Sequence, residues 1–466
     1  MQRRTLLVLA GLALVALAAK APLLLHAPPY GDEGLFLYGA QHPFQVPQHV
    51  AHPDGSPIYF PRSLVLERPL FYAASWLPAQ LGFPAFRLWN AAIGALLAPL
   101  AYVLVRESGG RRATGVLAGL AVGLAPQLVV WGTYGQTDAL MTLLLGLSLL
   151  ARARGGHLAA GLLMLGAVWT KETAFAAAGL VLLLELRHGR DRRRLACHAL
   201  PVLLGLAPLL LAIATGFPIP GTHESSFHLQ LVDEAFLSPW LLPVLLVGVA
   251  LPASRRGAAT GLLGGGLLLA MHAVLYSVQA WYLVPSVFLA LVGVAVAADA
   301  AWRAPSWPRL ARVAPAAVAG LVILAAILLP AGPARAALRP LHGDGGDALA
   351  GTYAYETGIR DRDLVAALAA LQLDGRHDLV AVGVYHAHLY PLEPKVRWLW
   401  MDSADAGPVA ARLAATSARM AANGTWAIVA LDADSVATAF QERFAACAAW
   451  HEGRYAVYDG SRCTPG

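Results

Sequence analysis

Apolar stretches of about 18 to 20 residues recur between the N-terminus and roughly residue 330. A helix of that length crosses a hydrocarbon core of roughly 30 Å, whereas the helices of soluble cores are shorter. Only 13% of the residues are charged and 58% are apolar, whereas soluble domains carry about 25% charged residues. These features predict an integral membrane protein that spans the bilayer several times.

The basic residues gather in short loops between the apolar stretches. The clusters are Arg111-Arg112, Arg152 with Arg154, residues 187–194 and Arg255-Arg256. Cytoplasmic loops of membrane proteins show this bias. The formal net charge of +6 is therefore assigned to membrane topology, and a nucleic-acid partner is not expected.

Arginine placement also predicts the orientation, because each crossing reverses the side of the membrane. A first helix near residues 5–25 is read as a retained span that leaves a cytoplasmic N-terminus. About eleven crossings satisfy every loop, and the stretch 26–85 becomes an external loop. The fold class expected for residues 1–330 is an all-α bundle in the inner or plasma membrane, with about 11 transmembrane helices.

The stretch 157–186 is too long for one transmembrane span and short for two. Basic clusters flank both of its ends, so both ends are expected in the cytoplasm and the stretch must cross the membrane an even number of times. Two short helices that meet at residues 169–172 satisfy this constraint. The turn then lies at the external side and carries Lys171.

From about residue 331 the hydropathy falls, which predicts a separate external α/β domain over residues 331–466. Strands are expected at 378–385, 426–431 and 454–459, and helices at 408–421 and 435–446. Cys447 and Cys463 form a disulfide if the domain lies in an oxidising compartment; the alternative is two free thiols.

Several ionisable residues lie on the external side of this topology, where unpaired charge is costly. Each has an ordinary explanation: Asp32 and Asp138 as helix caps, Glu67-Arg68 as a loop ion pair, and Arg87 and Lys171 as interfacial cations. Their common face instead suggests one pocket, in which an acid activates an acceptor and cations hold a phosphate.

The motifs resemble those of multi-spanning glycosyltransferases that use polyprenyl- or dolichyl-phosphate-linked sugars, such as protein O-mannosyltransferases and the aminoarabinose transferases. In that superfamily an Asp-Glu pair follows the first helix. An acidic-Lys-Pro element precedes the second helix, and an Arg lies at the start of that helix. Asp-Ala-Leu, Thr-Lys and Tyr-Leu-x-Pro elements come later. The corresponding residues here are Asp32-Glu33, Glu67-Arg68-Pro69, Arg87, Asp138-Ala139-Leu140, Thr170-Lys171 and Tyr282-Leu283-Val284-Pro285.

The resemblance implies a role for each of these positions. Asp32 would be the base, with Glu67 and Asp138 on the acceptor side as the further catalytic residues. The donor phosphate would be held by cations, with Glu33 and Tyr282 also binding substrate; these cations are Arg68, Arg87 and Lys171. The partners implied are a lipid-phosphate-linked sugar and a lipid, glycan or protein acceptor.

The sequence departs from the superfamily pattern at three positions. Arg68 replaces the commoner Lys, Leu70 replaces a second Pro, and Trp281 replaces a frequent Arg. The contacts to the phosphate are therefore expected to be rearranged.

Histidines 42, 49, 52, 223 and 228 lie in the external loops. Their spacing matches no compact ligand motif, so no metal ligand is assigned, although a divalent ion remains an alternative.

Two other functions remain open. A transporter would place ionisable residues near the midplane of repeated halves, and no repeat is visible. A scaffold of the cell envelope would not need the Asp32-Glu33 pair.

Overall fold

The protein, described here from a computed structural model, divides into two compact units. The first contains Met1–His26 and Val65–His342, and the second contains Ala27–Leu64 and Gly343–Gly466. The structure describes the following residues: 3–26, 33–44, 50–51, 68–188, 191–214, 241–251, 255–274, 282–304, 308–328, 378–382, 397–401, 416, 426–430, 435–452 and 455–462.

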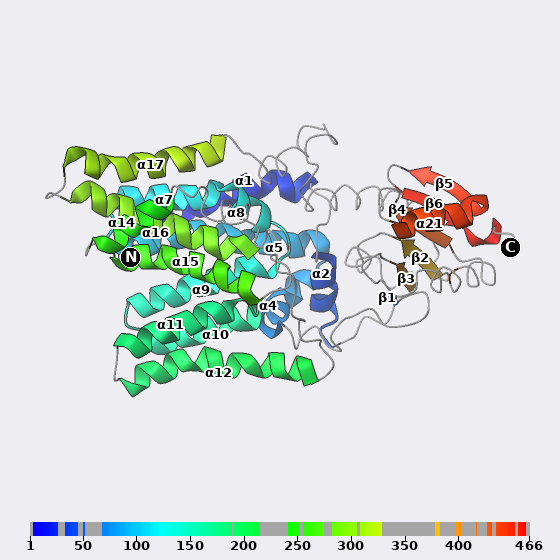
Figure 1. Ribbon diagram of the computed structural model, residues 1–466, viewed down its shortest axis with the longest axis horizontal. Coiled ribbons are helices and arrows are strands. Elements are labelled where there is room, and N and C mark those ends of the chain that lie inside the picture. Colours follow the sequence, from blue (N-terminus) through cyan, green and yellow to red (C-terminus); the bar gives the residue numbers. More distant parts are fainter. Residues whose placement is uncertain are drawn as a thin grey trace. The chain divides into compact units, whose positions relative to one another are not determined.

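The first unit is a bundle of helices that run side by side (Figure 1). Its described helices are α1 (Arg3–His26), α4 (Pro69–Gln80), α5 (Phe83–Ala95), α6 (Leu97–Glu107), α7 (Arg112–Leu124), α8 (Pro126–Trp131), α9 (Thr137–Ala153), α10 (His157–Thr170), α11 (Ala174–His188), α12 (Arg192–Ala214), α14 (Leu241–Ala250), α15 (Arg255–Val274), α16 (Leu283–Arg303) and α17 (Arg309–Leu328).

The predicted pair of short helices is present. Helix α10 ends at Thr170 and α11 begins at Ala174, so Lys171 lies in the turn between them. The apolar stretch 114–131, which the sequence predicts as a single transmembrane helix, is instead divided into α7 and α8. Pro126 explains the break, because proline lacks an amide hydrogen and disfavours a helical conformation at the preceding residue. Ala125 accordingly has φ −58° and ψ 122°.

The outer surface of the bundle is apolar. Leu14 on α1, Leu117 on α7 and Leu203 on α12 are exposed by 66%, 66% and 68%. Large apolar surfaces of this kind face lipid or a partner rather than water. Among the described helical segments, three are long and apolar enough to span a bilayer. They are Arg3–Leu24 in α1, Phe83–Glu107, which consists of the consecutive helices α5 and α6, and Leu283–Arg303, which is α16. The number of about eleven crossings stays a prediction.

Small residues allow the helices to approach closely, as is common within membranes. A methyl group built on Gly293 of α16 would lie 2.6 Å from the Cα of Gly261 on α15. A methyl group on Gly123 of α7 would lie 3.1 Å from the Cβ of Ala16 on α1. Gly293 therefore has no room for a larger side chain, whereas a side chain at Gly123 would require a small shift of Ala16.

The second unit contains helix α2 (Glu33–Gln41) and a six-stranded mixed sheet in the order β1-β3-β2-β4-β6-β5. The strands are β1 (Val50–Ala51), β2 (Asp378–Val382), β3 (Arg397–Met401), β4 (Trp426–Ala430), β5 (Ala448–Glu452) and β6 (Tyr455–Asp459). Strands β1 to β4 pair in parallel, while β4–β6 and β6–β5 are antiparallel.

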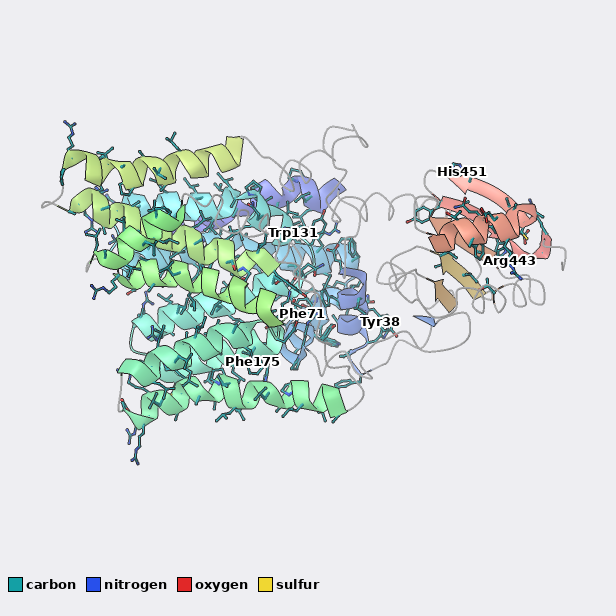
Figure 2. The ribbon with its side chains drawn as sticks, viewed as in Figure 1. Tyr38, Phe71, Trp131, Phe175, Arg443 and His451 are labelled. Carbon is teal, nitrogen blue, oxygen red and sulfur yellow. The ribbon has the colours of Figure 1, made fainter. Side chains whose placement is uncertain are left out.

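The centre of the sheet is buried, with Val380 and Val382 of β2 and Ile428 of β4 fully covered. Helix α21 (Ser435–Phe444) packs on it, and its Phe440 meets Tyr458 of β6 edge to face at 5.5 Å. The same helix carries Arg443, and β5 carries His451 (Figure 2). Burial raises the pKa of the Tyr458 hydroxyl.

Strands expected near 378, 426 and 454 and the helix near 435 are present, whereas β1, β3 and β5 were not predicted. The first loop was expected to belong with the bundle, but its strand β1 pairs with β3. Apart from its residue 416, the helix expected at 408–421 lies outside the described residues. Cys447 is disulfide-bonded and Cys197 is free, and Cys463 is the remaining cysteine of the chain.

Candidate functional site

A buried ion pair joins Asp138 and Lys171. The Lys171 Nζ lies 2.8 Å from both the Oδ1 and the Oδ2 of Asp138. The two side chains are only 0% and 2% exposed. The same ammonium lies 3.6 Å from the centroid of the Tyr282 ring, in cation–π geometry. Three of the predicted site residues, far apart in sequence, therefore meet at one point.

The helical hairpin of α9 and α10 explains why this pair forms. Asp138 is in the first turn of α9, and Lys171 directly follows the last residue of α10. Because the two helices are joined by a short turn at their other ends, the first turn of one lies beside the end of the other. The Ser148 hydroxyl donates to the Ala160 carbonyl at 2.7 Å and ties the two helices together.

The turn before α9 is held by a lysine of α1. Lys20 is 1% exposed, and its Nζ donates to the carbonyl oxygens of Leu128 at 2.6 Å and Val129 at 3.2 Å. These carbonyls belong to α8, which ends at Trp131, six residues before α9 begins. A buried lysine thus binds the backbone that leads into Asp138. Trp131 is itself buried in this part of the bundle (Figure 2).

Arg87 packs against the same turn. It is 2% exposed, near the start of α5, and its guanidinium carbon lies 4.5 Å from the centroid of the Phe83 ring and 5.1 Å from that of Tyr134. Tyr134 is four residues from Asp138 in the chain. Arg87 and Lys171 therefore contact two residues of one short segment.

A second ion pair lies next to Lys171 in the chain. The Nε of Arg68, which precedes α4, is 3.5 Å from an Oε2 of Glu172. Burial alone would raise the pKa of the Glu172 carboxyl, but the positive charges of Arg68 and Lys171 outweigh it and hold that pKa below its ordinary value. The turn between α10 and α11 thus carries Lys171 and Glu172, each paired with a charge from another segment.

The structure describes only some of the other predicted residues. Asp32 and Glu67 lie outside the described residues. Glu33 begins α2 and is fully buried, and it belongs to the second unit. His42 contacts Tyr38, with ring centroids 4.9 Å apart, while histidines 49, 52, 223 and 228 are not described. Within the described part of the chain, no three His, Cys, Asp or Glu side chains gather as metal ligands.

Sequence reasoning did not assign roles to Lys20, Tyr134 or Glu172. The sequence does contain a signal that Lys20 has a structural role, because a lone lysine inside an apolar span needs a hydrogen-bond acceptor. Glu172 adjoins a predicted site residue, but its pairing with Arg68 depends on how α4 packs. Tyr134 is an aromatic in a turn and carries no comparable signal.

An apolar helical bundle with buried ion pairs at the end of a helical hairpin defines a polytopic membrane protein with an ionic site. Residues 71–187 match the sequence model of the dolichyl-phosphate-mannose-protein mannosyltransferase family. That segment includes Arg87, Asp138 and Lys171. The resemblance predicted from the motifs is therefore confirmed in the part of the chain that contains the ion pair.

Solved structures show the same fold. ArnT from Cupriavidus metallidurans bound to undecaprenyl phosphate has a TM-score of 0.61 and 19% identity, with 99% of each chain covered. Archaeal oligosaccharyltransferase AglB from Archaeoglobus fulgidus, in complex with an inhibitory peptide and a dolichol-phosphate, has a TM-score of 0.56 and 14% identity. That match covers 92% of this chain and 70% of AglB. No curated protein sequence matches significantly.

Proposed function

We propose that the chain is a glycosyltransferase that moves a sugar from a polyprenyl-phosphate donor to a lipid, glycan or protein acceptor. The observation that carries this proposal is the buried Asp138–Lys171 pair beneath Tyr282, within and beside the segment that matches a mannosyltransferase family. The likeness in fold to proteins solved with undecaprenyl phosphate and dolichol-phosphate supports the donor class. The sugar would be a hexose or a pentose.

The cations of the site would hold the donor phosphate. An ammonium carries three hydrogens, so Lys171 can keep its two hydrogen bonds to Asp138 and donate the third to a phosphate oxygen. Arg87 and Arg68 would add charge-assisted hydrogen bonds, which are the strong ones for phosphate. In this role Asp138 fixes the ammonium in place, and Tyr282 covers it.

The reaction that follows is a displacement at the anomeric carbon. The acceptor oxygen would attack that carbon while the bond to the phosphate oxygen breaks, and polyprenyl phosphate would leave with the negative charge. Asp32 would take the proton of the acceptor, with Glu33 binding substrate and Glu67 shaping the acceptor side. Clamping the leaving phosphate lowers the barrier because charge develops there in the transition state.

The orientation is part of the proposal. A cytoplasmic N-terminus agrees with the arginine-bearing loops, and the disulfide at Cys447 agrees with an oxidising compartment for residues 331–466. The site would then act on the external side of the inner or plasma membrane, with the bundle of residues 1–330 holding the donor.

The test is a comparison of cells that carry the wild-type protein, no protein, Asp32→Asn or the matched loop variant Asp54→Asn. Mass spectrometry of lipids and glycoproteins should show a sugar modification with wild type and Asp54→Asn that is absent from the null and Asp32→Asn cells. Equal modification in all strains, at equal protein levels, would reject a transferase.

A further inference from the structure

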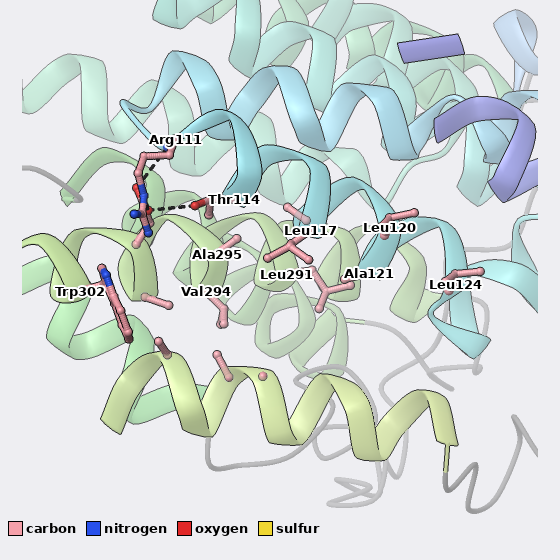
Figure 3. Close-up of a pocket in the computed structure, with 16 residues that line it drawn as sticks. Arg111, Thr114, Leu117, Leu120, Ala121, Leu124, Leu291, Val294, Ala295 and Trp302 are labelled. Carbon is pink, nitrogen blue, oxygen red and sulfur yellow. Dashed lines mark hydrogen bonds and ion pairs between the residues drawn. The ribbon is translucent and has the colours of Figure 1, made fainter. Parts of the chain in front are cut away.

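A groove of about 490 Å³ runs between α7, α16 and α17. Its walls are almost wholly apolar, formed by leucine, valine, alanine and glycine. Leu117 and Leu124 of α7 lie along one side, and Figure 3 shows them spaced along the groove with α17 facing them. Leu117 is 66% exposed, so this part of the wall is on the surface of the bundle.

One end of the groove is polar. The buried Asp299 of α16 accepts from the Nε of Arg111 at 2.6 Å and from the Thr114 hydroxyl at 2.9 Å. Its other oxygen, Oδ2, lies 2.9 Å from an Nη2 of Arg303. Asp299 is 0% exposed, whereas Arg111 and Arg303 are 53% and 41% exposed.

Among the described residues at this end, the Arg111 and Arg303 guanidinium groups outnumber the single Asp299 carboxylate. The carboxylate neutralises the charge of one guanidinium group, so one positive charge remains. Both arginine side chains are partly exposed. Trp302 also lines this end and is 46% exposed, and Figure 3 shows it at the same end of the groove as Arg111. A tryptophan beside exposed arginines is typical of the headgroup level of a bilayer.

This polar end lies at the opposite end of the bundle from the Asp138–Lys171 pair. Asp138 opens α9, and Arg154 follows the last residue of that helix. Arg154 pairs with Glu107, the last residue of α6, and Arg111 follows four residues later. A helix of 17 residues is about 25 Å long, so the two ionic centres lie at opposite ends of the bundle.

We propose that the groove binds an anionic phospholipid of the surrounding bilayer. One acyl chain would lie along the apolar wall of α7, α16 and α17, and the phosphate would sit against Arg111 and Arg303. An anionic headgroup offsets the surplus charge that Asp299 leaves, which a zwitterionic lipid with a net charge of zero does not do. The lipid would also fill the space between α17 and the other two helices. This site does not depend on the proposed transfer reaction.

Glycine 320 offers a clean way to block the groove. It lies on α17, lines the groove, and a methyl group built on it meets no atom within 4 Å. Gly320→Leu should therefore fill the groove without a clash. Gly11 on α1 has the same open surroundings and is outside the groove, which makes Gly11→Leu the matched control.

The experiment uses the full-length protein in phosphatidylcholine nanodiscs with a tracer of phosphatidylglycerol that carries a photoactivatable group in one acyl chain. After irradiation, mass spectrometry should locate cross-links on α7, α16 and α17. Gly320→Leu should lose most of them, and Gly11→Leu should keep them. A photoactivatable phosphatidylcholine tracer should label these helices about fivefold less.

A second variant tests the effect of the positive charge without changing the shape of the apolar groove. Arg303→Gln removes one cation and leaves the Arg111–Asp299 pair, so labelling by phosphatidylglycerol should fall toward that by phosphatidylcholine. Equal labelling by the two tracers in the wild-type protein would overturn the proposal, whatever the variants do. Unchanged labelling in Gly320→Leu would overturn it as well.

Discussion

Asp138 and Lys171 form an ion pair with almost no contact with solvent, and such pairs are sensitive to loss of one partner. Removing a single member leaves an uncompensated buried charge, whereas replacing both by apolar residues is often neutral. This asymmetry separates the structural role of the pair from its role toward a substrate.

Lys171→Met and Asp138→Asn should each lower the stability of the protein by about 3 to 5 kcal/mol, measured as thermal unfolding in one detergent. The double variant Asp138→Leu/Lys171→Met should recover most of that stability. A double variant no more stable than either single one would show that the pair does not act as a unit.

Lys20 positions the backbone that leads into Asp138. Lys20→Met keeps the length of the side chain but removes its donors, so the turn before α9 should shift and the proposed sugar transfer should slow about tenfold or more. Lys20→Arg, which keeps donors, should retain more activity than Lys20→Met. Full activity in Lys20→Met would show that the turn is positioned by other contacts.

Helix α16 begins next to Tyr282, and its close contact with α15 depends on a pair of glycines. Gly261 and Gly293 face each other with no space for a Cβ. The helix that has Tyr282 at its N-terminus is therefore packed closely against α15.

Gly293→Val should lower thermal stability by about 1 to 3 kcal/mol, because overpacking forces the helices apart. Gly11→Val, whose new side chain meets open space, should change stability much less. Equal effects of the two substitutions would show that helix propensity, and not the α15–α16 contact, is responsible.

The helices were the part of the structure that the sequence predicted best. Long apolar runs and arginine clusters predict α1, α9, α12 and the short hairpin at residues 169–172, because a bilayer leaves the backbone few alternatives. The sequence predicted that Asp138 and Lys171 lie on the same external face, but it did not predict their ion pair. The geometry of that pair depends on the packing of α9 against α10. The pairing of Arg68 with Glu172 and the hydrogen bonds from Lys20 to α8 could not be predicted, because they depend on contacts between segments that are distant in the sequence.

The sheet was harder to predict for a different reason. Strand β1 has two residues and pairs with β3, which is more than 300 positions later in the chain. No local pattern reveals a pairing of that range. Strand β3 carries arginine and tryptophans rather than an alternating pattern, so it too gives little signal.

The orientation of the whole molecule can be tested by labelling cysteines in intact cells. In a Cys197→Ser background, Glu442→Cys, at an exposed position of α21, should react with a membrane-impermeant maleimide, because this domain is proposed to be external. Arg192→Cys, at the start of α12 in a basic cluster, should react only after the membrane is permeabilised. The reverse pattern would invert the proposed topology.

Binding of radiolabelled undecaprenyl phosphate to the purified full-length protein tests the proposed phosphate site most directly. The wild-type protein and Arg154→Gln, a variant of the ion pair at the other end of α9, should bind it equally. Asp138→Leu/Lys171→Met, which leaves no unpaired charge, should bind it at least about tenfold more weakly. Wild-type affinity in that double variant would contradict the assignment of Lys171 to the donor phosphate.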